Sequence, residues 1–335
     1  MKKFDVITIG SALRDVMFYS DKFMVATNPH PDPLCKKIMG AELGAKLKSN
    51  EVFFEFGGGA SNTAVNFSQL GLKTAVLSTL GDDFDGRAIA EYFRQHHISP
   101  ALLQVSKQKR TGFSFLAVNK KSGEHVAHIY YGAAEDLLVK PVWFRQHKTA
   151  WYYVSSLNTE ASKWRRVLTG VCTQAKSYLA WNPGSAQLAS GYRLLSPFLK
   201  RTFLLILNRD EAIELILSHP QRKKAGSIQQ MLKYLYGWGP KIVLITDGAK
   251  GAQVYDGRNF YAEKALVKKP KDTTGAGDCF ASSFLAGFIR YQGNISAAMK
   301  LAMYNSASLV SQVGAQRGLL TWQALPSRFH LKQGR

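Results

Sequence analysis

The sequence predicts an α/β protein with a mainly parallel central sheet and helices on both faces. Short apolar runs with the composition of buried strands recur at residues 4–10, 74–80, 151–155, 178–182, 203–207 and 242–246. Helical periodicity alternates with them, near residues 60–70, 85–97, 159–176, 209–217, 226–237, 276–290 and 295–313. Because parallel strands need crossover connections, usually helices, this alternation indicates a parallel sheet.

Two segments depart from the alternation. Residues 111–131 look like two strands joined by a hairpin turn around Ser122-Gly123. Residues 16–56 contain the loop-forming cluster N-P-H-P-D-P and end in the strand-like run E-V-F-F-E-F. Since neither an internal repeat nor a linker is visible, we expect one domain over residues 1–335, with these two segments inserted into it.

The bulk composition is typical of a soluble globular protein. The chain has 335 residues, of which 46% are hydrophobic and 20% charged, and no apolar run approaches the ~20 residues that span a bilayer. Three widely spaced cysteines form neither a disulfide framework nor a zinc pattern, so we expect a cytoplasmic protein without a membrane partner. The net charge of +21 is unusual, but the basic residues are scattered, which favours a solvated surface over a nucleic-acid site.

The most informative run is D-T-T-G-A-G-D at residues 272–278. It leads into a helical apolar pattern, so its glycines stand at a helix N-terminus, where free N–H groups and the helix dipole bind anions. A carboxylate in this turn would repel a simple anion. Asp278 therefore fits an enzyme that transfers a phosphate, with Asp278 deprotonating the acceptor hydroxyl. A capping Asp beside a tight turn is the structural alternative.

The same run resembles the C-terminal signature of the ribokinase-like (PfkB) family of sugar and nucleoside kinases. The N-terminal signature has a counterpart in F-G-G-G-A-S-N-T-A-V-N-F-S-Q-L-G at 56–71 and L-S-T-L-G-D-D-F-D-G at 77–86. The resemblance implies a three-layer α/β/α fold, with a small β-lid built by strands from about 16–56 and 111–131. It implies ATP-dependent, Mg²⁺-assisted transfer of the γ-phosphoryl group to a hydroxyl of a sugar or sugar-like molecule.

The resemblance also assigns roles to residues. Asp278 would be the base, with a pKa lowered by the helix dipole, beside the amides of Gly275, Ala276 and Gly277. The acceptor would contact Asp15, Gly57, Gly58 and Asn62. ATP would contact Asn208, Thr246, Gly248, Gly251 and Asn305, and Glu211 would hold Mg²⁺ through water. Further expectations are a monovalent-cation (K⁺) site that includes Asp272 and a homodimer formed through the lid.

Several of these residues also have structural explanations. Asn208 and Glu211 fit a capping box, in which each side chain accepts from the other residue's N–H. The turn at 245–251 fits an ordinary strand end, and the glycines at 57–58 fit a strand-to-helix turn. Asn305 could face the adenine or satisfy a neighbouring loop.

The acceptor has two candidate classes. A sugar requires polar groups around Asp15, whereas a nucleoside requires aromatic rings to stack on its base, for which Phe18, Tyr19, Phe113 and Tyr131 are candidates. A protein of a different class, which kept the fold for ligand or nucleic-acid binding and lost turnover, is the remaining alternative; the intact Asp278 and G-A-G argue against it.

Overall fold

The computed structural model describes residues 2–29, 37–49, 51–121, 125–221, 224–267 and 269–330. The turn expected at Ser122-Gly123 lies outside the described residues, as does most of the N-P-H-P-D-P cluster.

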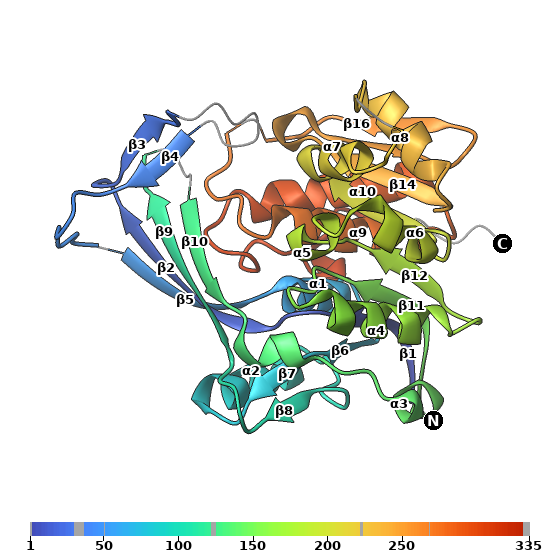
Figure 1. Cartoon of the computed structure of the whole chain (residues 1–335), viewed down its shortest axis with the longest axis horizontal. Helices are drawn as coiled ribbons and strands as arrows, with labels where there is room; N and C mark the ends of the chain where they lie inside the picture. The colour runs from blue at the N-terminus through green and yellow to red at the C-terminus, as the bar shows by residue number, and fades with distance from the viewer. Residues whose placement is uncertain are drawn as a thin grey trace.

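An eight-stranded sheet forms the centre of the protein (Figure 1). Its strands lie in the order β16 (Phe260–Glu263), β15 (Ala252–Tyr255), β14 (Ile242–Thr246), β13 (Leu204–Asn208), β12 (Tyr178–Trp181), β11 (His147–Val154), β1 (Lys2–Ile9) and β6 (Thr74–Leu77). Neighbouring strands from β14 to β6 are parallel, and only the β14–β15 and β15–β16 pairs are antiparallel. The predicted mainly parallel sheet is confirmed.

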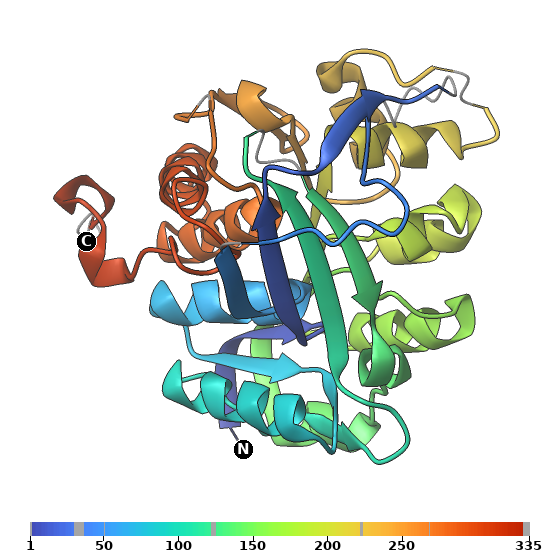
Figure 2. The same cartoon turned by 90° about the vertical axis from the view of Figure 1, so that its left-hand side faces the viewer.

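Helices cover both faces of this sheet, as Figure 2 shows. The strands alternate between the two layers: in β14, Val243 and Ile245 pack into one apolar core and Ile242 and Leu244 into the other. The first core includes α4 (Ala161–Cys172), α6 (Gly191–Leu199), α7 (Arg209–Leu217) and α8 (Ile228–Tyr236). The second includes α1 (Gly59–Gln69), α9 (Ala276–Arg290) and α10 (Ile295–Leu309). The architecture is therefore the predicted three-layer α/β/α.

A second sheet projects from the body and curves over one end of it (Figure 1). Its strands lie in the order β10 (His125–Tyr130), β9 (Gly112–Asn119), β2 (Leu13–Ser20) and β5 (Glu51–Gly57). A two-stranded ribbon, β3 (Met24–Thr27) with β4 (Lys37–Gly40), extends from it. We call this four-stranded sheet the lid sheet. Because β2 already begins at Leu13, Asp15 belongs to a strand of the lid sheet rather than to a connection after β1.

Several smaller elements were not predicted. The expected strand at 74–80 is two strands, β6 and β7 (Thr79–Gly81), and β7 pairs with β8 (Gln104–Ser106) beside α2 (Phe84–Gln95). The remaining elements are α3 (Pro141–Gln146), α5 (Ser185–Leu188), η1 (Gly132–Asp136), η2 (Gly248–Lys250), η3 (Trp322–Ala324) and η4 (Ser327–Phe329). Within the described residues, no helix has the length and apolar composition needed to cross a membrane. A cytoplasmic location stays a prediction.

Candidate active site

The loop that precedes α9 places Asp278 in the first turn of this helix. Gly275 is the N-cap residue and has a left-handed backbone, with φ of 71°. A Cβ atom at this position would lie 2.7 Å from the Cβ of Ala315, so both the backbone angle and the close approach require glycine. Asp278 follows three residues later, at the end of α9 where the backbone N–H groups are free.

The carboxylate of Asp278 is held by one side chain. Asn62 Nδ2 donates a hydrogen bond to Asp278 Oδ2 at 2.8 Å, while Oδ1 accepts no hydrogen bond from the described residues. Burial raises the pKa of Asp278 to about 6, and the bond from Asn62 opposes this rise. The prediction that the helix dipole lowers this pKa was therefore wrong, because loss of solvent outweighs the dipole. A pKa near 6 suits a general base that works near neutral pH.

A chain of hydrogen bonds orients Asn62. Gln316 Nε2 donates to Asn62 Oδ1 at 2.8 Å and to the backbone oxygen of Phe56 at 2.8 Å. Tyr92 Oη in turn donates to Gln316 Oε1 at 2.7 Å. With Oδ1 engaged by Gln316, Asn62 must present its NH₂ group to Asp278. Neither Gln316 nor Tyr92 was among the residues predicted from the sequence.

The anion site at the start of α9 has fewer free amides than expected. The N–H of Ala276 donates to Thr273 O at 3.1 Å, which closes the turn before the helix. Ala276 is thus not a free donor, and this expectation is corrected. The N–H groups of Gly275 and Gly277 have no acceptor among the described residues. A Cβ atom on Gly277 would meet nothing within 4 Å, so this residue faces open space.

A cavity of about 340 Å³ adjoins this turn. It collects six of the predicted residues, which are Asn208, Thr246, Gly248, Gly251, Ala276 and Gly277. Asn208 and Thr246 are the last residues of the neighbouring parallel strands β13 and β14, so the cavity opens at the carboxyl edge of the sheet, where α/β proteins commonly bind ligands. Apolar side chains, including Phe280 and Met303, complete the lining. The cavity has the character of a nucleotide site, with an apolar wall beside a glycine turn.

Asn305 does not reach this cavity. It is fully buried, and its Nδ2 donates to Asn66 Oδ1 and to Ser283 Oγ, at 2.9 Å each. Its Oδ1 accepts from the N–H of Leu320 at 2.9 Å. The adenine role predicted for Asn305 is therefore corrected: the side chain satisfies a neighbouring loop and ties α10 to α1 and α9.

Glu211 fits both roles considered for it. Its Oε2 accepts from the N–H of Asn208 at 2.8 Å, and Asn208 Oδ1 accepts from the N–H of Glu211 at 2.8 Å, which is the capping box. Its Oε1 accepts no hydrogen bond from the described residues. Burial, followed by the charges of Glu214 and Asp278, raises the pKa of Glu211 to about 7. Glu211 thus lies within electrostatic range of Asp278, with one oxygen free for a hydrated cation.

Asp15 and Gly57 meet on adjacent strands of the lid sheet. A Cβ atom on Gly57 would lie 1.8 Å from Asp15 Oδ2, so only glycine leaves room for this carboxylate. Asp15 is 6% exposed and hydrogen-bonds with Ser114, its neighbour on β9. Burial raises the pKa of Asp15 to about 7, and the charges of Glu55 and Asp278 add to the rise. Gly58, which caps α1, connects this strand to the helix that carries Asn62.

The candidate stacking residues are spread over different places. Strand alternation puts Phe18 and Phe113 on the face of the lid sheet opposite to Asp15. Tyr19 lies on the same face as Asp15, but its Oη donates to Asp272 at 2.9 Å. Tyr131 lines a small cavity, which it shares with Ser11. The surroundings of Asp15 are thus polar rather than aromatic among these positions.

Asp272 has a structural role. Its Oδ1 accepts from the N–H and the Oγ1 of Thr274, and its Oδ2 accepts from Tyr19 Oη and the N–H of Gly314, at 2.7–2.9 Å. Burial alone would raise the pKa of Asp272, but these donors together lower it. Four hydrogen bonds use the lone-pair positions of a carboxylate, so the expectation of a side-chain K⁺ ligand at Asp272 is corrected. Asp272 instead joins the lid sheet to the loop before α9.

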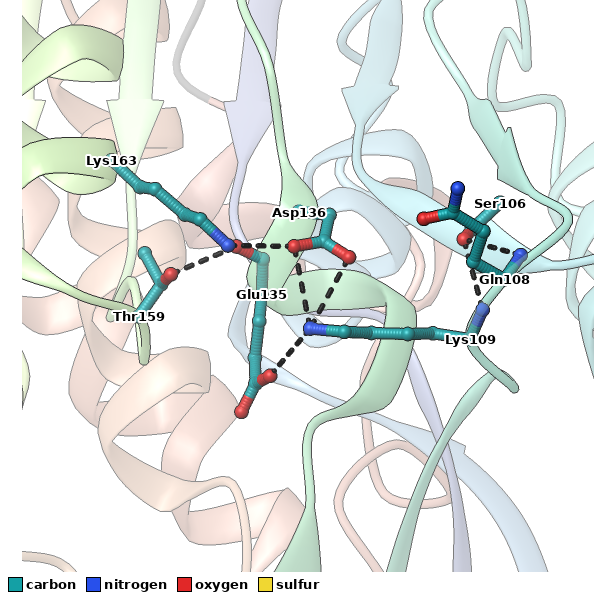
Figure 3. Close-up of polar contacts among 7 residues, drawn as sticks. All are labelled: Ser106, Gln108, Lys109, Glu135, Asp136, Thr159 and Lys163. Carbon is teal, nitrogen blue, oxygen red and sulfur yellow. Dashed lines mark hydrogen bonds and ion pairs between the residues drawn. The ribbon is translucent and has the colours of Figure 1, made fainter.

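Ion pairs hold the base of the lid sheet to the body (Figure 3). Lys109, just before β9, contacts Glu135 at 2.9 Å and Asp136 at 3.2 Å. Lys163 on α4 contacts Asp136 at 2.7 Å, and Thr159 Oγ1 donates to the backbone oxygen of Glu135 at 2.8 Å. The hydrogen bond from Lys163 is the main cause that lowers the pKa of Asp136. Each partly exposed pair contributes only about 0–1 kcal/mol, but together they fix the segments that enter and leave β9 and β10.

The chain is similar to known kinases in both sequence and fold. Residues 3–322 match the pfkB family of carbohydrate kinases. The 5-dehydro-2-deoxygluconokinase of Bacillus licheniformis is 23% identical over 96% of this chain and 94% of its own. Among solved structures, the ribokinase of Giardia lamblia has a TM-score of 0.78 at 18% identity, covering 97% of this chain and 99% of its own. The nucleoside kinase of Burkholderia thailandensis in complex with inosine has a TM-score of 0.75 at 17% identity, covering 97% of both chains.

The family match spans nearly the whole chain, and both family signatures lie in the loops and helices that build the site. The chain therefore belongs to the pfkB family of carbohydrate kinases and has the ribokinase fold.

Proposed function

We propose that this kinase transfers the γ-phosphoryl group of ATP to a hydroxyl of a sugar or sugar-like small molecule. One observation carries the proposal. Asp278 accepts a hydrogen bond at 2.8 Å from Asn62, on the acceptor side, while its chain neighbour Gly277 lines the cavity that Asn208 and Thr246 also line, so this candidate base lies between the two sides of the site. A phosphoryl-transfer base must stand between an acceptor and a nucleotide in this way.

The reaction follows from the free groups of the site. Asp278 Oδ1 takes the proton of the acceptor hydroxyl while Asn62 holds Oδ2. The hydroxyl oxygen then bonds to the γ-phosphorus as the bond from this phosphorus to the β–γ bridging oxygen breaks, and ADP leaves. The N–H groups of Gly275 and Gly277 stabilise the charge on the transferring group. Asp15 accepts hydrogen bonds from other hydroxyls of the sugar and so fixes the position of the reacting one.

The residues present fit a magnesium ion held largely by phosphates and water. The described residues contain no group of three or more His, Cys, Asp or Glu side chains able to hold a metal. Glu211 offers one carboxylate oxygen that accepts no protein hydrogen bond, which suits a water-mediated contact. When bound, Mg²⁺ would neutralise charge on the phosphates. Dependence on K⁺ stays a prediction, without the carboxylate of Asp272 as a ligand.

The polar surroundings of Asp15 favour a sugar over a nucleoside as the acceptor. The experiment is ADP release measured across a panel of sugars, sugar acids and nucleosides, with ATP hydrolysis in the absence of acceptor as the baseline. A sugar or sugar acid that raises ADP release far above the baseline supports the proposal. Preference for a nucleoside would favour the runner-up, and no response to any acceptor would favour a protein that binds ligands without turnover.

We also propose a homodimer formed through the outer face of the lid sheet. This face, opposite to Asp15, exposes large apolar side chains: Val52 (38%), Phe54 (60%), Phe113 (39%), Val126 (37%) and Tyr130 (53%). A contiguous apolar patch of this kind is typical of a protein interface. Sedimentation of the wild type beside Phe54→Glu tests it, because a dimer should become a monomer, whereas a monomeric wild type would refute it.

A further inference from the structure

The segment from Leu137 to Arg209 has a strong excess of positive charge. Between Leu137 and Arg209 the sequence holds eleven Lys and Arg residues and a single acidic residue, Glu160. Within the described residues, Lys163 is the only one of these eleven that pairs with a carboxylate. Most of the excess charge in this segment is therefore not balanced by ion pairs among the described residues.

The parallel sheet arranges part of this charge in a row. Six neighbouring strands each carry a basic residue at their second position or one to three residues ahead of the strand. In the order of the sheet these are Lys73 (β6), Lys3 (β1), Lys148 (β11), Lys176 (β12), Arg201 (β13) and Lys241 (β14). All six are exposed, and none forms an ion pair with a described carboxylate. At about 4.8 Å between strands, the row extends over about 24 Å.

Two cations of the row stand directly opposite each other. Lys3 and Lys148 are register partners on β1 and β11. Like charges placed opposite each other on adjacent strands destabilise a sheet. A bound polyanion would remove this repulsion.

An aromatic surface lies within the row. Tyr178, the first residue of β12, is 52% exposed and follows Lys176 closely. Its ring packs against Trp151 and Phe203, with centroids 4.9 Å away in each case. These two rings support Tyr178 from the protein side and leave part of it open to solvent. An exposed ring among cations is the combination that binds single-stranded nucleic acids, since bases stack on the ring while cations contact the phosphates.

We propose that this edge of the sheet, here called the basic edge, binds a single-stranded polynucleotide. A linear row of cations matches a linear polyanion, and an exposed ring beside the cations can stack on a planar nucleobase. The sequence suggested a scattered, solvated surface because these six residues are far apart in the chain; the sheet brings them together.

The basic edge lies away from the candidate active site. It is the amino edge of the parallel strands, whereas Asn208 and Thr246 mark the carboxyl edge. In Figure 1 the N-terminus, where β1 begins, lies on the side of the molecule away from the lid sheet. A bound strand would therefore leave the kinase site open, and the inference does not depend on the proposed acceptor.

The test uses the full-length protein and a fluorescein-labelled 20-nucleotide uridine-rich RNA, with anisotropy measured over a series of salt concentrations. The edge variant is Lys148→Gln/Lys176→Gln/Lys241→Gln. The matched control, Lys22→Gln/Lys46→Gln/Lys107→Gln, removes the same charge from exposed lysines elsewhere. The edge variant should lower the slope of log K against log salt by about 2, at about 0.7 for each phosphate contact to a single strand, while the control leaves it near the wild-type value. Tyr178→Ser should weaken binding roughly fivefold or more.

Circular dichroism spectra and thermal melting curves, measured on all variants, show whether each of them folds. Equal slopes for the edge variant and the control would overturn the proposal, because binding would then follow net charge alone. So would binding to vesicles containing phosphatidylserine with none to RNA, or competition between RNA and ATP for the same site.

Discussion

The amide of Asn62 points its NH₂ group at Asp278, at 2.8 Å, because its oxygen is taken by Gln316 at 2.8 Å. The orientation of the group that holds the base is therefore set by a residue that need not touch either substrate. Gln316 acts as a positioning residue.

We expect Gln316→Glu to reverse this orientation. A glutamate presents an acceptor to Asn62, so the amide turns and places its oxygen against the carboxylate of Asp278. Losing this charge-assisted hydrogen bond, worth roughly 1.5–3 kcal/mol, should lower kcat about tenfold or more. It should also raise the pKa of the base, because the bond from Asn62 favours the ionised form.

The pH profile separates this role from a structural one. Asp278 must be ionised to act, so wild-type kcat/KM should rise as the pH passes about 6. In Gln316→Glu this rise of kcat/KM should occur at higher pH. Tyr92→Phe removes only the hydroxyl that donates to Gln316, and the rise should stay at nearly the wild-type pH. If both variants merely lose activity at every pH, Gln316 supports the fold and not the base.

The two glycines at the start of α9 should respond in opposite ways to alanine. Gly277→Ala adds a Cβ atom to open space, so the melting temperature should change little while kcat falls, because the methyl group occupies the approach of the phosphate. Gly275→Ala forces a left-handed residue against Ala315 and should destabilise the protein by over ~1 kcal/mol. Melting curves and steady-state kinetics on both variants check this. A normal kcat in Gly277→Ala would exclude the anion site at this position.

A comparison of Glu211→Gln with Glu211→Ala separates the capping role of Glu211 from its role toward Mg²⁺. Glutamine keeps an oxygen that accepts from the N–H of Asn208, so Glu211→Gln should retain the cap and the melting temperature. Without the negative charge it should need more Mg²⁺ for half-maximal activity. Glu211→Ala should show the same magnesium effect and lose about 1 kcal/mol of stability in addition. A magnesium titration that is unchanged in both variants would leave Glu211 with the cap alone.

We expect the buried carboxylate of Asp15 to lower the stability of the folded protein at pH values above its pKa. Its pKa in the folded state is about 7, above the ordinary value of 3.8, so the folded state favours the protonated form. The stability that protonated Asp15 adds to the folded state is fully present at low pH and is lost as the pH rises from about 4 through about 7. Asp15→Asn should therefore be more stable than the wild type at pH 8, by an amount on the order of 4 kcal/mol, and the gain should shrink toward pH 4.

The same substitution should raise KM for the acceptor sharply while KM for ATP moves little. Denaturant unfolding at both pH values and kinetics with each substrate varied in turn provide the check. Equal increases in both KM values would mean that Asp15 maintains the fold instead of holding the sugar.

The sequence predicted the parts of this protein that have strong local patterns. β13, β14, α7 and α9 agree with their apolar runs and caps to within a residue, because each combines periodicity with a clear start signal. Short elements such as α5 and β16 have only four residues and were missed, since so few positions define no period. The end of α10 was placed too late, at 313 instead of Leu309, because the turn that follows depends on a contact between Gly314 and Asp272.

The candidate site likewise contains residues that the sequence predicted correctly and residues that it did not. The motifs and their spacing predicted Asp278, Asn62 and the cavity-lining residues, because the residue type at each position indicates its chemistry. Asn305 and Asp272 were misassigned, since both are polar residues whose partners come from distant segments. Tyr92 could not be found from the sequence, because only the fold brings α2 beside Gln316.

The most direct test of the account is Asp278→Asn, assayed for acceptor-dependent ADP release and for ATP binding by calorimetry. Asparagine keeps the shape of the side chain but cannot take a proton, and the amides of Gly275 and Gly277 remain in place. We predict that phosphoryl transfer falls by at least two orders of magnitude, the scale of general-base catalysis, while the dissociation constant for ATP changes less than about threefold. Turnover near the wild-type rate in this variant would contradict the assignment of Asp278 as the base, and with it the proposed mechanism.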